Sequence, residues 1–216
     1  MHDVKKPLSG GQIWLLSLLL CMFIVVIAFA YLDAAIARYV YPLVGQLDGL
    51  AEGLGSAVLL TLEAITVLTL VIIRIRRGHL PPLSEAVALA CLSSICAYAI
   101  NASVLKVFFG VPTPADVLEG TKHAFNLAQG TMNSSFPSGH MVLAGAFSGV
   151  LMRLYRRSVL PLSVLLLVGA TLLILGDWHF LSDVIAGTFV GVSAGLLAGE
   201  LWLAHSGQVT GDRESQ

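Results

Sequence analysis

The sequence predicts an all-α membrane protein, a bundle of six transmembrane helices, and three observations lead to this prediction. The chain has 216 residues, of which 56% are hydrophobic and 12% are charged, whereas a soluble domain carries about 25% charged residues. Six apolar runs approach the length of about 20 residues that crosses a bilayer. Short polar or basic segments separate the runs. Because the formal net charge is −1 and basic residues stay at the ends of the runs, we expect no nucleic-acid partner.

The six predicted spans form a single membrane domain over residues 13–205, between a polar segment at residues 1–12 and a short polar tail at residues 206–216. The spans are residues 13–32, 56–73, 84–105, 138–154, 159–175 and 182–203. The mixed segment between the first two spans carries tyrosines, which favour the depth of the lipid headgroups. We therefore expect that segment to lie at the membrane interface.

Arginine and lysine residues predict the orientation of the bundle. They concentrate at residues 5–6, 74–77 and 156–157, which lie on one side of a chain with six spans. The positive-inside rule places these segments, and with them the N-terminal segment, in the cytoplasm. The long loop at residues 106–136 and the turn at residues 177–182 then share the other side. We expect a protein of a bacterial inner membrane whose site faces the periplasm or exterior.

Two features inside the spans predict how the helices pack. Glycines recur every four residues in the last span, so they form a stripe along one helix face. They are Gly187, Gly191, Gly195 and Gly199. Such a stripe lets another helix approach closely. Glu63 lies within the second span, and a carboxyl group at membrane depth usually faces the bundle interior or a wet cavity.

The segment Pro137-Ser138-Gly139-His140 is the first candidate for chemistry, because it begins a predicted helix directly after the long loop. The unpaired amides and the positive dipole end of a helix start bind anions such as phosphate. An imidazole beside that anion can give or take a proton near neutral pH. The alternative is an ordinary helix start beside a surface histidine.

The second candidate is His179 with Asp183, which lie four residues apart and therefore on one helix face. The carboxylate can accept a hydrogen bond from one ring nitrogen and leave the other nitrogen basic, as in a nucleophile or a general base. A local helix cap is the alternative. His140, His179 and Asp183 together lack the further Cys or His of a usual metal site, so we expect no metal.

In their order and spacing, these residues resemble the type 2 phosphatidate phosphatase superfamily, which includes the vanadium haloperoxidases. The resemblance covers residues 106–191. The second family motif, Pro-Ser-Gly-His, is intact, and the third ends at His179 and Asp183. Both motif arginines are missing, because Thr113 and Leu173 stand at their positions. Arginine grips phosphate with a planar pair of donors that neither residue can supply.

The resemblance implies the roles of the site residues. His179 would attack a phosphate to form a phosphohistidine, Asp183 would orient it, and His140 would protonate the leaving oxygen. Lys106, Ser138 and Gly139 would hold the phosphate, and no metal or other cofactor is implied. The long loop offers Lys122 and His123 as further donors.

The expected function is that of a membrane phosphatase or phosphotransferase in lipid metabolism, acting on a lipid phosphate or a polyprenyl diphosphate. Two alternatives remain open. One is a transferase that acts on a less charged headgroup, and the other is an inactive family member that binds lipid or scaffolds a complex. Asp177, two residues before His179, would cap the turn or bind a hydroxylated acceptor or a cation.

Overall fold

The structure is a computed structural model that describes the backbone of residues 9–44 and 49–214 and the side chains of residues 9–42 and 55–206. All regular secondary structure in these residues is helical. The helices are α1 (Gly10–Ile27), α2 (Asp33–Val44), α3 (Gly49–Arg77), α4 (Pro82–Ile100), α5 (Lys106–Phe109), α6 (Pro114–Leu118), α7 (Gly139–Leu154), α8 (Val159–Leu175) and α9 (Leu181–Glu214). The predicted all-α membrane fold is confirmed.

Five helical segments are long and apolar enough to cross a membrane, among the residues described. They are Gly10–Pro42, Gly55–Arg77, Pro82–Leu118, Arg156–Leu175 and Leu181–Ser206. The sixth apolar helix is α7, which has only 16 residues and a length of about 24 Å, less than a bilayer core of about 30 Å. Because α7 packs against α4, α8 and α9, its neighbours rather than lipid cover most of its surface.

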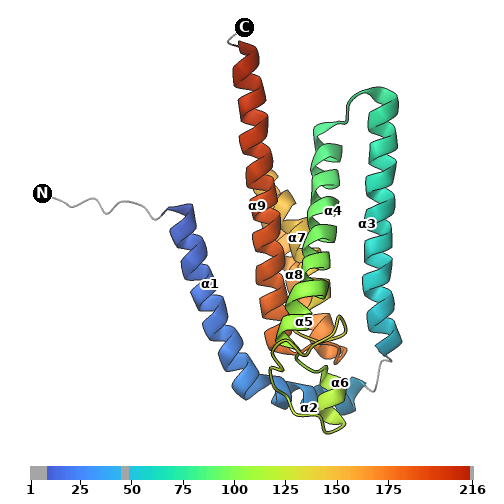
Figure 1. The fold of residues 1–216 in the computed structure, drawn as a ribbon, viewed down its shortest axis with the longest axis vertical. Helices are drawn as coiled ribbons and strands as arrows, with labels where there is room; N and C mark the ends of the chain where they lie inside the picture. The colour runs from blue at the N-terminus through green and yellow to red at the C-terminus, as the bar shows by residue number, and fades with distance from the viewer. Residues whose placement is uncertain (1–8, 45–48, 215–216) are drawn as a thin grey trace, which may run out of the picture.

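The first span does not end where the apolar run suggests. A π-helical turn at Ala28–Leu32 joins α1 to α2, so the helical path continues to Val44. Figure 1 shows α1 along the side of the bundle and α2 across one end. Insertions of this kind are a recognised cause of helix bends. The expected interfacial segment therefore corresponds in part to α2, while residues 45–48 lie outside the described residues.

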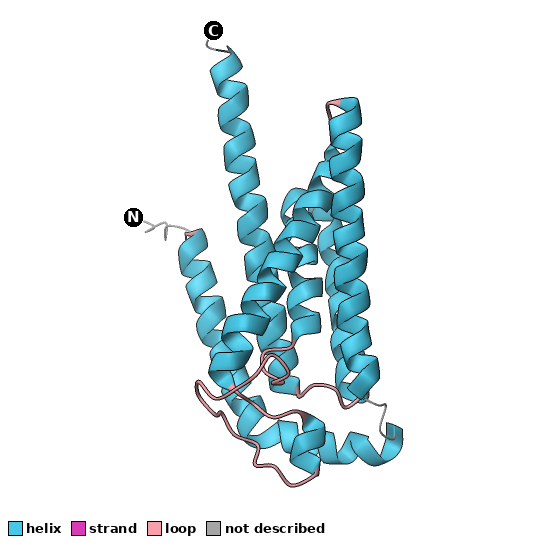
Figure 2. Ribbon diagram, turned by 45° about the vertical axis from the view of Figure 1, so that its right-hand side comes forward, coloured by secondary structure: helices cyan, strands magenta, loops and turns pink. Residues whose placement is uncertain are grey.

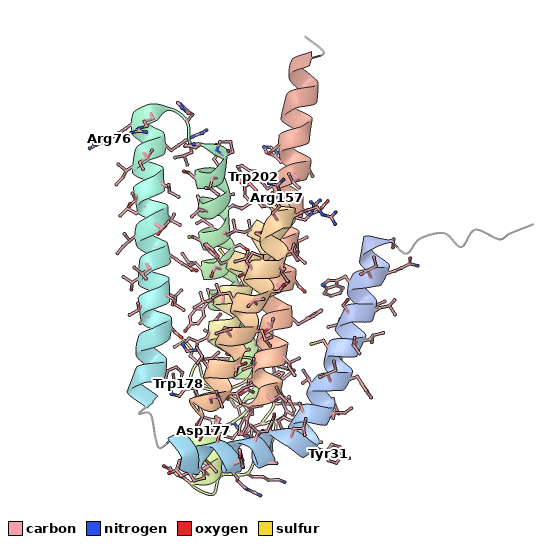
Figure 3. All side chains as sticks on the ribbon, turned by 180° about the vertical axis from the view of Figure 1, so that it is seen from behind. Tyr31, Arg76, Arg157, Asp177, Trp178 and Trp202 are labelled. Atoms are coloured by element: carbon pink, nitrogen blue, oxygen red, sulfur yellow. The ribbon has the colours of Figure 1, made fainter. Side chains whose placement is uncertain are left out.

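The longest loops lie at the end of the bundle that α2 crosses, as Figure 2 shows, whereas the connection between α3 and α4 lies at the other end. The loop between α6 and α7 and the turn between α8 and α9 both lie at the end that α2 crosses. Figure 3 shows Asp177 and Trp178 at this end and Arg76 and Arg157 towards the opposite one. The separation of basic connections from the motif-bearing loops thus agrees with the expected arrangement.

The glycine stripe of α9 faces α7, as predicted. A Cβ atom on Gly191 would lie 2.5 Å from the carbonyl oxygen of Val142, and one on Gly187 would lie 2.5 Å from the carbonyl oxygen of Ser138. The contact is reciprocal, because a Cβ atom on Gly145 of α7 would lie 3.0 Å from the amide nitrogen of Val192. The two backbones therefore touch, which fixes the start of α7 against the start of α9.

Glu63 lines a cavity of about 380 Å³ between α3, α4, α7 and α8. The cavity is mainly apolar, with Thr66 and Ser148 among its few polar residues. One carboxyl oxygen of Glu63 is buried without a hydrogen-bond partner among the described side chains. The predicted inward position of this residue is therefore observed.

Gly191→Ala should destabilise the protein by about 1–3 kcal/mol, because the new methyl group would push α7 away from α9. Gly169→Ala in α8 is the matched control, since nothing lies within 4 Å of a Cβ atom at that position. We expect the control to unfold at the wild-type temperature or slightly above it. The measurement is the thermal unfolding midpoint of each purified variant in detergent. Equal midpoints for the two variants would contradict the close α7–α9 contact.

Candidate functional site

The start of α7 is held rigidly at the centre of the site. Ser138 is the N-cap residue, and its hydroxyl oxygen accepts the Met141 amide at 3.5 Å. The Ser138 amide itself donates to the carbonyl of Asp183 at 3.1 Å, which ties α7 to α9. Asn101 donates to the carbonyl of Pro137 at 3.2 Å. The amides of Gly139 and His140 belong to the first turn of α7, where the amides of an α-helix point towards the space before its start.

Asp183 is completely buried and serves two purposes. Its Oδ2 accepts the Phe180 amide at 2.8 Å, which caps the start of α9. The same oxygen accepts the hydroxyl of Ser135 and lies 3.5 Å from His179 Nδ1. The Ser135 oxygen is 3.3 Å from that ring nitrogen. The helix cap, one of the two alternatives in the sequence, is therefore observed, and the same carboxylate lies close to the His179 ring.

The ring of His140, in the first turn of α7, lies close to the ring of His179, in the turn between α8 and α9. Their centroids are 5.9 Å apart and their planes are inclined by 72°. His179 is 3% exposed, whereas His140 is only half-buried. His140 Nε2 lies 3.0 Å from the hydroxyl oxygen of Ser56 in α3, and the Trp178 ring stacks against His140 with a centroid distance of 6.4 Å. A nucleophile and a proton donor on opposite sides of one phosphorus atom would use this arrangement.

The three expected cationic or basic donors lie in different surroundings. Lys106 begins α5 and is 8% exposed, while Lys122 is exposed in the loop after α6. His123 stacks on Phe29 at a centroid distance of 4.1 Å, and the Phe180 ring lies against it at 4.3 Å with a tilt of 44°. Burial lowers the pKa of His123, and its Nε2 lies 3.7 Å from Asp33 Oδ2. His123 thus contacts a carboxylate and aromatic rings, whereas the Lys122 side chain is exposed.

The two positions that differ from the family motifs have structural roles here. Thr113 is the N-cap of α6, where its hydroxyl accepts the Asp116 amide at 3.2 Å and its amide donates back to the Asp116 carboxylate at 3.0 Å. Leu173 is 7% exposed and packs in an apolar cluster with Met141 and Val184. Neither position presents a polar group that could replace an arginine on phosphate.

Three polar residues near the site were not predicted from the sequence. Ser56 and Ser135 contact the two histidines, and Asp33 accepts hydrogen bonds from Ser182 at the start of α9. Serines are frequent, and a lone serine at the start of a span or in a loop carries no signal. Asp33 ends an apolar run, where a charged residue is expected in any membrane helix.

The comparison with known protein families agrees with the motifs. The model of the PAP2 superfamily matches residues 86–204, more than half of the 216-residue chain. The match contains α7 and the start of α9, and therefore both histidines and Asp183. No curated protein and no solved structure matches the chain. Since the intact motifs and the site geometry fall within the matched region, the chain belongs to the PAP2 superfamily.

Proposed function

We propose that this protein is an integral membrane phosphatase or phosphotransferase that acts on a lipid phosphate through a phosphohistidine at His179. The observation that carries the proposal is the placement of two histidine rings 5.9 Å apart, with the Asp183 carboxylate 3.5 Å from His179 Nδ1. A carboxylate on one ring nitrogen keeps the other nitrogen available for attack. Membership of the PAP2 superfamily supports chemistry on phosphate esters.

The proposed reaction has two steps. His179 Nε2 attacks phosphorus, the bond from phosphorus to the lipid oxygen breaks, and His140 gives its proton to that oxygen. Water or the hydroxyl of an acceptor then attacks the phosphohistidine, His140 takes the proton, and the P–N bond breaks. The first-turn amides of Gly139 and His140 and the ammonium group of Lys106 would stabilise the charge on the phosphoryl oxygens, with the Ser138 side chain holding the turn.

The location of the site supports a lipid substrate on the non-cytoplasmic side. The motif-bearing loops lie at the end of the bundle opposite Arg76 and Arg157 (Figure 3). The positive-inside rule places the arginines in the cytoplasm, so the site would face the periplasm or exterior of a bacterial inner membrane. Candidate substrates are phosphatidate, phosphatidylglycerophosphate, lipid A phosphates and polyprenyl diphosphates.

A transferase that acts on a less charged phosphodiester headgroup is the second candidate. The observation in its favour is the loss of positive charge where Leu173 packs in an apolar cluster and Thr113 caps α6. A dianionic monoester needs more cationic donors than a diester with a single charge. Asp177 adds an acidic group beside Trp178, and burial raises its pKa to about 6. A site with these groups suits a headgroup that carries an amine or a hydroxyl.

The first test is phosphate release from a panel of lipid phosphates and diphosphates by the purified protein. His179→Ala should lower release by about 10³-fold or more, because the residue forms the covalent bond. His205→Ala is the matched control, an exposed histidine in α9 distant in sequence from both motifs. We expect wild-type rates from the control.

The products separate the candidate functions. Free phosphate that disappears in His179→Ala supports a phosphatase, and a new lipid without free phosphate supports a transferase. Tight binding of anionic lipid with neither product, unchanged in His179→Ala, would instead show an inactive member that binds lipid. That outcome would overturn the proposal.

Asp177→Asn should stabilise the protein at neutral pH. Burial raises the pKa of this carboxyl to about 6, so the wild type loses stability as the pH rises from about 4 to about 6 and the asparagine variant does not. We expect a gain of about 1 kcal/mol near pH 7.5, reduced because the side chain is partly exposed to solvent. Asparagine also tolerates the left-handed backbone at this position, where φ is 55°.

The measurement is the thermal unfolding midpoint near pH 7.5 and near pH 4.5, where the difference from the wild type should shrink. Glu119→Gln, an exposed carboxyl group after α6, is the control. A loss of stability in Asp177→Asn at neutral pH would mean that a charged Asp177 has a stabilising partner.

A further inference from the structure

Asp33 is one of the most deeply buried charged residues of the described chain, although it is absent from every motif of the family. It begins α2, next to the π-helical turn, and is 1% exposed. Its Oδ1 accepts the amide of Ser182 at 3.0 Å, and its Oδ2 accepts the hydroxyl of the same residue at 2.5 Å. Both oxygens of the carboxylate therefore accept hydrogen bonds from a residue 149 positions later in the chain.

The donors of these hydrogen bonds belong to the first turn of α9. Helix starts are usually capped by a Ser, Thr, Asp or Asn directly before the helix, whose side chain accepts the second or third amide. Here the residue before Leu181 is Phe180, which has no acceptor. Asp33 accepts the second amide from another helix, while Asp183 accepts the amide of Phe180. Two carboxylates thus satisfy and electrostatically stabilise the start of α9.

The same segment also holds the long loop. Phe29 lies one helical turn before Asp33, and its ring stacks on His123 with a centroid distance of 4.1 Å. The His123 ring also lies against Phe180, with a centroid distance of 4.3 Å, and its Nε2 is 3.7 Å from Asp33 Oδ2. The bend between α1 and α2, the loop after α6 and the start of α9 therefore meet at Asp33.

His179 depends on this junction because it immediately precedes Phe180 and has no helix of its own to fix it. Its ring position follows from the backbone of Phe180 to Asp183, which Asp33 and Asp183 hold from two sides. Displacement of a reacting group by about 1 Å can lower a rate by about 10²-fold. A residue that never touches the substrate can therefore control the rate of transfer.

We propose that Asp33 is a positioning residue for His179, and that the bend between α1 and α2 completes the site although it lies outside the matched residues 86–204. The inference rests on the proposed function of His179 as nucleophile. The Asp33 carboxylate caps α9, the cap sets the position of the imidazole, and the imidazole sets the rate of the chemical step.

The activity test compares Asp33→Ala, Asp33→Asn and Ser182→Ala in the full-length protein, with the best lipid phosphate as substrate. Asp33→Ala should lower kcat by about 10²-fold and leave KM within about twofold, because the phosphate-binding groups stay in place. Asp33→Asn keeps an oxygen that can accept a hydrogen bond from the Ser182 amide. Its kcat should therefore be at least about tenfold higher than that of Asp33→Ala. Ser182→Ala removes one of the two bonds and should give an intermediate kcat.

Ser94→Ala is the matched control for Ser182→Ala. Both serines are fully buried, and the Ser94 hydroxyl donates to the carbonyl of Leu143 at 3.0 Å, away from α9. We expect the control to lower the unfolding midpoint without changing kcat. If folded Asp33→Ala and Ser182→Ala retain the kcat of Ser94→Ala, the positioning role is wrong. Should Asp33→Ala fail to fold, Asp33→Asn and Ser182→Ala decide the same question.

A second readout does not require turnover. The ¹⁵N signals of the His179 imidazole, measured in labelled protein in detergent, should shift in Ser182→Ala and in folded Asp33→Ala but not in Ser94→Ala. Unchanged signals in the first two variants would overturn the positioning role whatever the enzyme does. Shifted signals in a protein that turns over no lipid phosphate would support the role of Asp33 and count against the proposed function.

Discussion

The close contact between α7 and α9 is the constraint on which the rest of the site depends. Glycines allow the two backbones to touch, so that a Cβ atom on Gly191 would lie 2.5 Å from the carbonyl oxygen of Val142. The same contact continues to the helix starts, where the Ser138 amide donates to the carbonyl of Asp183 at 3.1 Å. His140 lies in the first turn of α7, and His179 lies in the turn directly before α9. Since the two backbones cannot slide or separate without clashes or lost hydrogen bonds, helix packing limits the distance between the two imidazole rings.

The buried carboxylates of the site and the first-turn amides of α9 satisfy each other's hydrogen bonds. A carboxylate inside a membrane bundle needs donors, and the first turn of a helix has amides that need acceptors. Asp33 and Asp183 meet both needs at α9, and Ser135 bridges Asp183 to His179. This arrangement makes the site less positive than one built around arginines. The loss of charge at Thr113 and Leu173 and the presence of these carboxylates therefore act in the same electrostatic direction, because each makes the potential at the site less positive.

The sequence predicted those parts of the molecule that depend on local spacing. Glycines four residues apart indicated the close helix face. The four-residue spacing also indicated that His179 and Asp183 lie close together, but His179 is in the turn before α9 and not, as was expected, on a face of that helix. The sequence also indicated the correct helical class, because apolar runs of this length have few other solutions in a membrane. It did not predict that α2 crosses the end of the bundle, because the π-helical turn continues the helix past the apolar run. Ser56 and Asp33 were missed for a related reason, since their partners lie 84 and 149 residues away and no local pattern marks them.

The site therefore draws on two parts of this chain, the residues that match the family and the residues before them. The matched residues 86–204 hold the proposed nucleophile His179, the proposed proton donor His140 and the start of α7 that would bind phosphate. The residues before them supply the contact of Ser56 to His140 and the cap of Asp33 on α9. α1 also forms one wall of an apolar cavity of about 720 Å³ against α8 and α9, whose lining includes Leu181 beside the capped turn. A movement of α1 would thus alter both the shape of this cavity and the position of Asp33. Because the π-helical turn joins α1 to α2, the wall of this cavity and the Asp33 cap belong to one continuous helical path.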